Sequence, residues 1–197
     1  MLKNIVKLTF IATFFLTSGI SHAQNFKGGA VLGINACQVD GDLLSGYNKL
    51  GFMAGAYVYK SFSDYFDMQL EIKYMGKGAN QKKNDASNNY YTNNSLHYIE
   101  IPIIARFNIQ KLGVEGGFGF GYLFSSFIKD DFGEFDLEPD EQMKPFEWSG
   151  IIGLNYKVTP KISVNIRYSY SILSIRHNYR VFFNNIISTG LFYQIGN

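Results

Sequence analysis

The stretch GVEGGFGFGYLF, residues 113–124, alternates between two kinds of residue. It has glycine at positions 117, 119 and 121, and an aromatic ring at four successive even positions: Phe118, Phe120, Tyr122 and Phe124. Successive side chains of a β-strand point to opposite faces, so one face of this strand carries a row of rings and the other carries very little. Glycine inside a strand marks a place where other groups approach the backbone closely. The stretch therefore predicts a strand whose glycine face lies in tight surroundings and whose aromatic face needs room for a row of rings.

The same two-residue rhythm recurs along the chain and predicts eight strands. A tilted strand of about 9–11 residues crosses the hydrocarbon core of a bilayer, and each of these segments is long enough to do so. The chain is 17% aromatic and contains 20 glycines, which favours an all-β fold. The predicted strands are residues 26–37, 50–60, 65–76, 96–107, 112–124, 146–156, 161–173 and 185–195.

The connections between these strands alternate in length. Those at 61–64, 108–111 and 157–160 are short, whereas those at 38–49, 77–95, 125–145 and 174–184 are long. Outer-membrane barrels have short periplasmic turns and longer extracellular loops. The pattern predicts an eight-stranded antiparallel up-and-down transmembrane β-barrel of one domain.

Nine charged residues of the predicted strands fall on one face. Parity alone fits both a soluble barrel with an apolar interior and a membrane barrel with an apolar exterior. The row of rings decides between them, because eight strands enclose room for only a modest set of side chains. A lysine or arginine that faces lipid at mid-depth costs about 2–4 kcal/mol, so the charges are expected to face inward. They are Lys27, Asp67, Glu71, Lys73, Glu100, Arg106, Glu115, Glu147 and Arg167.

The stretch EIPIIARF, residues 100–107, places Glu100 and Arg106 on that inner face, and Glu115 follows just beyond the next short turn. Long side chains at such cross-strand positions can meet. We predict a lumenal ion network of Glu71, Lys73, Glu100, Arg106, Glu115, Glu147 and Arg167. Pro102 lacks a backbone N–H, so a bulge or an unpaired carbonyl is expected there. Large inward side chains favour a filled lumen over a channel: Met53, Ile104, Leu123, Ile151 and Phe192.

Residues 1–23 have the form of a cleaved signal peptide, which leaves residues 24–197 as the barrel domain. Lys3 and Lys7 precede the apolar run LTFIATFFL, and SHA stands before Gln24. Without those two lysines the 18 basic residues fall to 16, equal to the 16 acidic residues. This balance predicts no nucleic-acid partner. Cys37 is the single cysteine, so no internal disulfide can form.

Catalytic and metal-binding patterns are weak. His97 and His177 are the histidines of the expected mature chain, and neither has an acid at a useful spacing. Residues 125–145 hold seven acids and two lysines, but their spacing differs from that of an EF-hand. We expect this acidic segment to be a solvated loop that packs against basic residues of the neighbouring loops: Lys77, Lys82, Lys83, Arg176 and Arg180. No catalytic residue, metal site or cofactor is predicted.

Two motifs, YIEIPIIARF at 98–107 and GVEGGFGFGYLF at 113–124, resemble the small outer-membrane β-barrel family of Bacteroidota often called PorT-like. The early strand FKGGAVLGINA and the signal peptide fit the same family. The resemblance implies an eight-stranded barrel in the cell outer membrane, and the namesake branch is associated with type IX protein secretion. The chain departs from such barrels at its end, FYQIGN, where many of them finish on an aromatic residue.

These observations favour a non-enzymatic outer-membrane protein that acts through its extracellular loops, in interaction or in envelope integrity. The alternative is a narrow pore or a transport- or secretion-associated component, and a lipid A-modifying enzyme is less favoured. The expected partners are outer-membrane lipid and lipopolysaccharide, and a protein partner that is either extracellular or part of a secretion machinery.

Overall fold

The computed structural model describes residues 26–42, 46–81, 92–130, 133–135, 143–177 and 181–195. The predicted signal peptide lies outside these residues. The strands are β1 (Phe26–Asp40), β2 (Lys49–Ser61), β3 (Phe66–Gln81), β4 (Thr92–Ile109), β5 (Leu112–Asp130), β6 (Gly133–Phe135), β7 (Phe146–Lys157), β8 (Ile162–Ser171) and β9 (Phe183–Ile195). No helix among the described residues is long and apolar enough to span a membrane.

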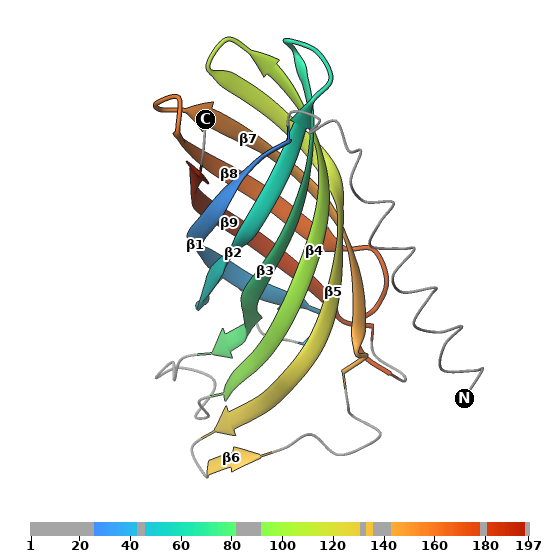
Figure 1. The fold of residues 1–197 in the computed structure, drawn as a ribbon. Coiled ribbons are helices and arrows are strands. Elements are labelled where there is room, and N and C mark those ends of the chain that lie inside the picture. Colours follow the sequence, from blue (N-terminus) through green and yellow to red (C-terminus); the bar gives the residue numbers. More distant parts are fainter. Residues whose placement is uncertain are drawn as a thin grey trace, which may run out of the picture.

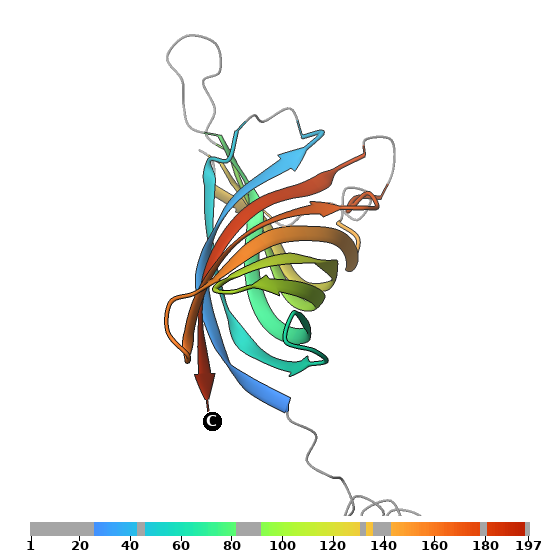
Figure 2. The same ribbon diagram turned by 90° about the horizontal axis from the view of Figure 1, so that it is seen from above.

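Eight of the strands form a closed antiparallel barrel (Figure 1). Each barrel strand pairs with the next along the chain, β5 pairs with β7, and β9 returns to pair with β1. β1 therefore lies between β2 and β9 (Figure 2). The short strand β6 pairs only with the end of β5 and stands outside the barrel wall. The predicted eight-stranded up-and-down barrel is confirmed.

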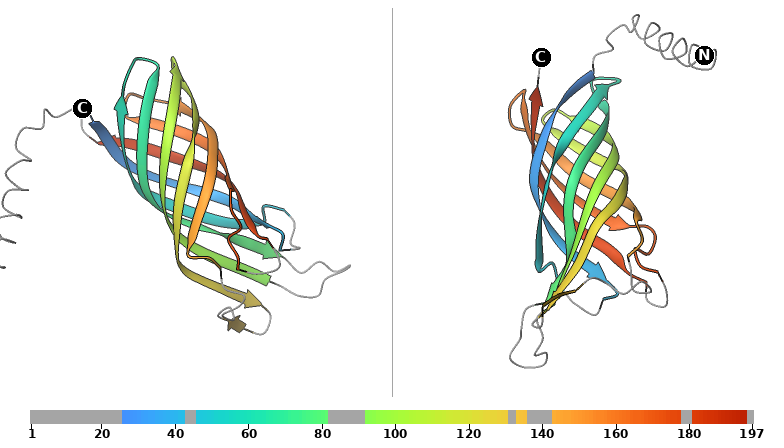
Figure 3. Two further views of the ribbon diagram at one scale, coloured as in Figure 1. Left: turned by 90° about the vertical axis from the view of Figure 1, so that its right-hand side faces the viewer. Right: turned by 60° about the horizontal axis from the view of Figure 1, so that its bottom comes forward.

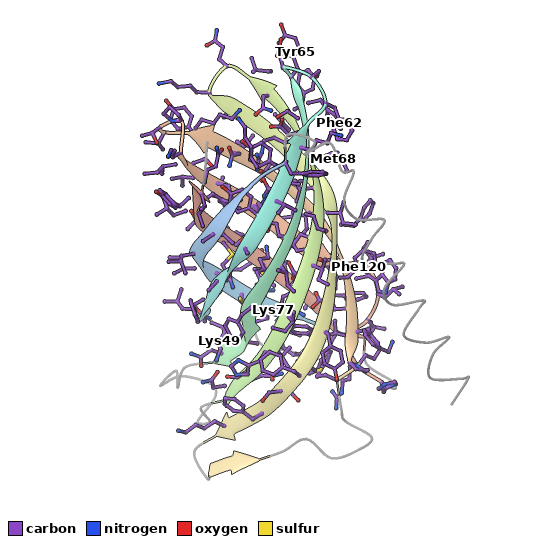
Figure 4. The ribbon with its side chains drawn as sticks, in the orientation of Figure 1. Lys49, Phe62, Tyr65, Met68, Lys77 and Phe120 are labelled. Atoms are coloured by element: carbon purple, nitrogen blue, oxygen red, sulfur yellow. The ribbon has the colours of Figure 1, made fainter. Side chains whose placement is uncertain are left out.

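The three short turns lie together at one end of the barrel, the upper end in Figure 1, and β6 lies at the other end. Phe26 pairs with Lys60 beside the β2–β3 turn, and Ile195 pairs with Gly28, so the first and last strands also meet the short-turn end. Since outer-membrane barrels have short periplasmic turns, this is the periplasmic end. Exposed rings mark its rim, among them Phe62 and Tyr65 (Figure 4).

The wall has an apolar outside and a polar inside. Phe118 and Ile152 are 59% and 64% exposed on the outer face, whereas Glu71 and Glu100 are each 1% exposed. Outer rings contact one another across strands, as in the edge-to-face pair of Phe120 and Trp148 with centroids 4.1 Å apart. The parity of the sequence thus places the aromatic rows toward lipid.

Three strands extend farthest beyond their predicted ends. β3 continues to Gln81, β4 starts at Thr92, and β5 runs to Asp130, so parts of the predicted loops 77–95 and 125–145 are paired strand. The prediction followed the alternation of apolar residues, which stops where a strand leaves the hydrocarbon region. Backbone pairing between strands continues beyond that point, so the predicted strands were too short. The seventh predicted strand, residues 161–173, is shorter in the structure, where β8 ends at Ser171.

Of the two outcomes expected at Pro102, a bulge or an unpaired carbonyl, the bulge is wrong. The register shift between β4 and β5 lies between His97 and Tyr98, and Pro102 pairs regularly with Gly119. On the other side, the β3–β4 pairing is interrupted between Leu70↔Ile103 and Lys73↔Glu100. Proline has no N–H to donate, so the ladder loses bonds at this point without any change of register.

Candidate functional site

The lumen of the barrel contains a ring of charged and polar side chains from four strands. Arg106 of β4 donates from Nε and Nη2 to Glu115 Oε1 of β5, at 2.8 and 2.6 Å. Arg167 of β8 donates from Nε to Glu115 Oε2 at 2.6 Å, and its Nη1 lies 2.8 Å from Glu71 Oε1. Gln69 closes the ring, because it donates to Glu71 Oε1 at 2.6 Å and accepts from Arg106 Nη2 at 2.7 Å.

A chain of alternating charges leads from this ring toward the extracellular end. Lys73 Nζ lies 3.3 Å from Glu71 Oε2 and 3.5 Å from Glu100 Oε1. Lys77 Nζ then lies 2.7 Å from Glu100 Oε2 and 3.0 Å from Glu147 Oε2. Figure 4 shows Lys77 on β3, toward the extracellular side of the barrel.

Two uncharged side chains donate hydrogen bonds to Glu147, the last carboxylate of this series of charges. Ser171 Oγ donates to Glu147 Oε1 at 2.7 Å, and Asn184 Nδ2 donates to Glu147 Oε2 at 2.9 Å. Every charge in the series thus has an opposite charge as its neighbour.

The ion chain, as we call these residues, is balanced. It contains four carboxylates and four cations: Glu71, Glu100, Glu115, Glu147, Lys73, Lys77, Arg106 and Arg167. None of them is more than 5% exposed. A buried charge without a partner is strongly destabilising, so a continuous series of opposite charges is the arrangement that tolerates this burial. The lumen is therefore filled by a neutral set of mutually paired groups.

All seven residues of the predicted lumenal network belong to the ion chain in the structure. Lys77 is the member that the sequence prediction missed, because it was assigned to a loop. Two signals could have found it: it shares the parity of Lys73, and the seven predicted residues left four carboxylates against three cations. Two other predicted inward charges lie elsewhere. Lys27 is exposed at the periplasmic rim, and Asp67 bonds to Ser61 and Asn108.

On the extracellular side of the ion chain, a cluster of buried apolar side chains, which we call the apolar plug, closes the mouth of the barrel. Backbone bonds tie Ile175 to residues before β7 and β9: Lys144 N–H donates to Ile175 O at 2.6 Å, and Ile175 N–H donates to Phe182 O at 2.8 Å. The plug residues are all buried: Cys37, Val39, Leu96, Met143, Ile175, Phe182 and Ile186. Cys37 has a free thiol that is fully covered within this plug.

Further side chains fill the rest of the lumen. Met53, Ile104, Ile151 and Phe192 are buried, and Leu123 packs at the edge of the core. A cavity of about 50 Å³ lies at the periplasmic end, beside Asp67, Gln69 and Arg106. A cavity of this size holds a few water molecules. The described residues thus enclose a filled lumen.

The extracellular ends of three strands continue the barrel wall beyond the neighbouring strands, and their inner face still carries Lys77 of the ion chain and Leu96 of the plug. Pairing of β2 with β3 stops at Met53↔Met75, and pairing of β5 with β7 stops at Tyr122↔Phe146. Beyond these points β3, β4 and β5 stay paired with one another, as far as Gln81↔Thr92 and Thr92↔Asp130, and β6 is added beside β5. We call residues 76–81, 92–97 and 125–130 with β6 the surface sheet, which projects at the lower end in Figure 3.

The two histidines occupy separate places. His97 faces outward on the wall, where its Nδ1 lies 2.7 Å from the Tyr74 hydroxyl and its ring stacks on Phe127 at 5.5 Å. His177 is exposed in the segment after β8. Within the described part of the chain, no three His, Cys, Asp or Glu residues are grouped as metal ligands. Most of the acidic segment, as well as Lys82, Lys83 and Arg180, lies outside the described residues, so the predicted packing between them is not described.

Comparison with known proteins places this geometry among outer-membrane barrels. The family model described as "Outer membrane protein beta-barrel domain" matches residues 22–176. No curated protein sequence matches the chain.

Similar solved structures include two outer-membrane proteins that each match 86% of the chain. Neisserial surface protein A has a TM-score of 0.57 at 17% identity, with 97% of its own chain covered. Ail, the attachment invasion locus protein of Yersinia pestis, has a TM-score of 0.54 at 14% identity, with 98% covered. A second structure of Ail holds the heparin analogue sucrose octasulfate. At these identities the likeness concerns the fold alone.

Proposed function

Because this chain belongs to the outer membrane protein beta-barrel domain family, we propose that it is a closed, non-enzymatic outer-membrane barrel that anchors the surface sheet for binding at the cell surface. The observation that carries the proposal is the combination of a filled lumen with strands that continue beyond it. The barrel is the anchor, and the sheet is the part available to a partner.

The filled lumen supports an anchoring role over a conducting one. The ion chain and the apolar plug occupy successive levels of the same interior. An ion that crosses would have to displace paired charges and then an apolar layer, each of which opposes passage. An eight-stranded barrel encloses little more than its own side chains, which fits this arrangement.

The surface sheet offers an unpaired strand edge. Beyond Met75 no described strand pairs with β3 on its β2 side. Residues 76–79 are nevertheless buried, and Asn35 Nδ2 donates to the carbonyl of Gly76 at 3.1 Å in this buried part, so the accessible part of the edge begins at Asn80. Extended peptides bind to such edges by adding a strand, so a protein segment is the favoured kind of partner.

The charge of the neighbouring acidic segment favours one chemical class of partner. Residues 125–145 carry seven acids and two lysines. Ail has been solved with a sulfated heparin analogue, but a polyanion of that kind would be repelled by this acidic segment. We therefore favour a protein partner with a basic surface over a sulfated polysaccharide.

A secretion-associated role is the second candidate. It rests on the PorT-like motif at residues 98–107, which supplies Glu100 and Arg106 to the ion chain. A lipid A-modifying activity is disfavoured, since His97 is engaged with Tyr74 and Phe127 while His177 lies in a separate segment.

A shortened hairpin tests the proposal. Asn80 and Asn93 pair opposite each other, so residues 80–93 can be replaced by an Asn-Gly turn that keeps the Ala79↔Asn94 pair as its base. Cells that carry the wild type, the shortened hairpin or a gene deletion are compared for adhesion to immobilised basic and acidic proteins, for protein secretion and for envelope leakage.

We expect the shortened hairpin and the deletion to lose adhesion to basic proteins equally, with normal secretion. Full adhesion by the shortened variant would contradict a role for the surface sheet. A secretion defect in the deletion strain with unchanged adhesion would support the second candidate instead.

A further inference from the structure

The cavity of about 50 Å³ at the periplasmic end of the lumen has cationic side chains at both its inner and its outer end. Arg106, which is 5% exposed, lies at the inner end, and Lys157 and Lys161 line the cavity from the β7–β8 turn. Both lysines have the parity of the lumenal residues on the adjoining strands, so they belong to the inner face of the wall. Because both are also exposed, the cavity opens to the periplasm beside them. We call it the periplasmic pocket.

Hydrogen bonds fix the backbone of both lysines at the mouth of this pocket. The Lys157 N–H donates to the Lys111 carbonyl at 2.8 Å, which ties the β7–β8 turn to the β4–β5 turn. The Lys161 carbonyl accepts from the Gln194 N–H of β9 at 2.8 Å, and the Lys161 N–H donates to Thr159 Oγ1 at 3.2 Å within the turn. The two cations are therefore held on the same side of the opening.

The charges that line the periplasmic pocket do not balance. Arg106 belongs to the ion chain, which is neutral as a whole. Asp67 is the single acid among the described residues of the lining, and its carboxylate oxygens accept from Ser61 Oγ at 2.6 Å and from Asn108 Nδ2 at 2.7 Å. Two lysines against this one aspartate leave one positive charge in excess. A concave site with an excess of positive charge attracts small anions.

Asn155 provides a second, independent sign of an occupant. This side chain lines the pocket, is 1% exposed, and its Oδ1 has no hydrogen-bond partner. Its Nδ2 donates to Ser163 Oγ over a long 3.4 Å. If the amide is turned by 180°, the Ser163 hydroxyl can donate to the oxygen, and the NH₂ group becomes free to donate to an anion in the pocket. Buried polar side chains normally have such a partner.

The volume of the periplasmic pocket limits the size of the anion. A water molecule needs about 10–15 Å³ of such space, so the pocket has room for only a few non-hydrogen atoms. A carboxylate on a short stem fits this room, and its single negative charge matches the single positive charge in excess. A phosphate dianion is larger and carries more charge than the lining balances.

We propose that the periplasmic pocket binds one carboxylate group that enters from the periplasm. Its oxygens accept hydrogen bonds from Lys157 and Lys161 at the mouth and from the Asn155 amide inside. The group belongs either to a small free acid or to the end of a periplasmic peptide, since both present the same chemistry. The inference is independent of the proposed role of the surface sheet.

Nuclear magnetic resonance of the purified full chain tests this site. The ¹⁵N-labelled barrel, folded in lipid nanodiscs, is titrated with acetate in exchange for chloride at constant ionic strength. We expect saturable shifts of the Asn155, Ile162 and Ser163 amides, with a Kd in the millimolar range. Acetamide, which has the same shape without the charge, should shift none of them.

The double variant Lys157→Gln with Lys161→Gln should raise the Kd for acetate at least about tenfold, because a hydrogen bond to a charged group is worth that much or more. Lys157→Arg with Lys161→Arg keeps the charge and should still bind acetate. The matched control is Lys60→Gln with Lys111→Gln, which removes the same charge from the same end of the barrel at residues outside the lining. It should bind acetate like the wild type.

Two further ligands distinguish the sources of the carboxylate. N-acetylglycylglycine carries it at the end of a peptide, and the amide of the same peptide lacks it. Saturable shifts with the peptide acid but not with its amide would assign the pocket to peptide ends as well as to free acids. Saturation with acetate alone would restrict it to small free acids.

Three results would overturn the proposal. They are shifts that rise linearly without saturation, as an adventitious ion only would give, an equal loss of binding in both lysine-to-glutamine double variants, or tighter binding of inorganic phosphate than of acetate at the same amides. Each variant is first checked for the gel mobility of the folded barrel.

Discussion

Arg106 and Glu115 face each other across the β4–β5 turn, and two N–H groups of the arginine bond to a single oxygen of the carboxylate, at 2.8 and 2.6 Å. The other carboxylate oxygen of Glu115 accepts from Arg167 at 2.6 Å. Glu115 is therefore shared by two buried cations, whereas Arg106 has one carboxylate. This asymmetry makes the contributions of the two residues distinguishable.

Glu115→Ala should destabilise the barrel more than Arg106→Ala. Removal of one member of a buried pair costs about 3–5 kcal/mol, and loss of Glu115 leaves two arginines short of an anion while loss of Arg106 leaves Glu115 with Arg167. The free energy of unfolding in urea with lipid vesicles measures both losses. Lys129→Ala, at an exposed position of β5, is the control and should change it by less than about 0.5 kcal/mol.

The double variant of Arg106 and Glu115 should recover part of the summed loss, with a coupling energy of about 1–3 kcal/mol. Strictly additive losses would mean that the two side chains do not stabilise each other in the folded barrel.

Lys77→Met should also destabilise the barrel by about 3 kcal/mol, because Glu147 loses its only cation in the ion chain. Glu100 keeps Lys73, so the uncompensated charge resides mainly on Glu147. Adding Glu147→Gln to Lys77→Met should restore part of the stability in the same unfolding assay. If the second substitution lowers the free energy of unfolding further, the loss of the Lys77–Glu147 pair is not the cause of the destabilisation by Lys77→Met.

Gly116 and Gly117 test the assignment of the two faces with neighbouring residues. A Cβ at Gly117 would clash with the carbonyl oxygen of Ile103, whereas a Cβ at Gly116 meets nothing within 4 Å. Gly117→Ala should therefore cost about 1–3 kcal/mol, as overpacking does, and Gly116→Ala should stay within about 0.5 kcal/mol. Equal effects on unfolding would contradict the crowded inner face and the open outer face at this level of β5.

Cys37 reports on the apolar plug. Its side chain is fully buried, so a water-soluble maleimide should leave it unmodified in the folded barrel and label it fully after unfolding. Mass spectrometry of the intact chain gives the degree of modification. As a positive control, a cysteine introduced at exposed Lys129 in a Cys37→Ser background should react at once. Rapid labelling of Cys37 in the folded protein would mean that the extracellular mouth is open.

The alternation of residues carries most of the fold. Rings at Phe118, Phe120 and Tyr122 opposite glycines fix which face meets lipid, and parity alone assigns Glu71 and Glu100 to the lumen. Pairing partners are harder to predict, because Arg167 meets Glu71 and Glu115 from a strand distant in sequence.

The surface sheet and Lys77 could not be predicted from apolar alternation, since that signal ends where the strands leave the membrane. Pairs such as Asn80↔Asn93 are held by backbone bonds between polar residues, which look like a loop in the sequence. For the same reason apolar alternation does not predict β6, and Lys77 was assigned to a loop.

Conductance is the most direct measure of the closed lumen. The ion chain between Arg106 and Glu147 and the plug around Cys37 and Ile175 leave no described passage through the barrel. Purified full-length protein, inserted into a planar bilayer at moderate salt, should therefore give no stable single-channel steps, while a known porin measured in the same bilayer does. Reproducible unitary steps from the pure, folded protein would contradict the account and make the narrow pore its function.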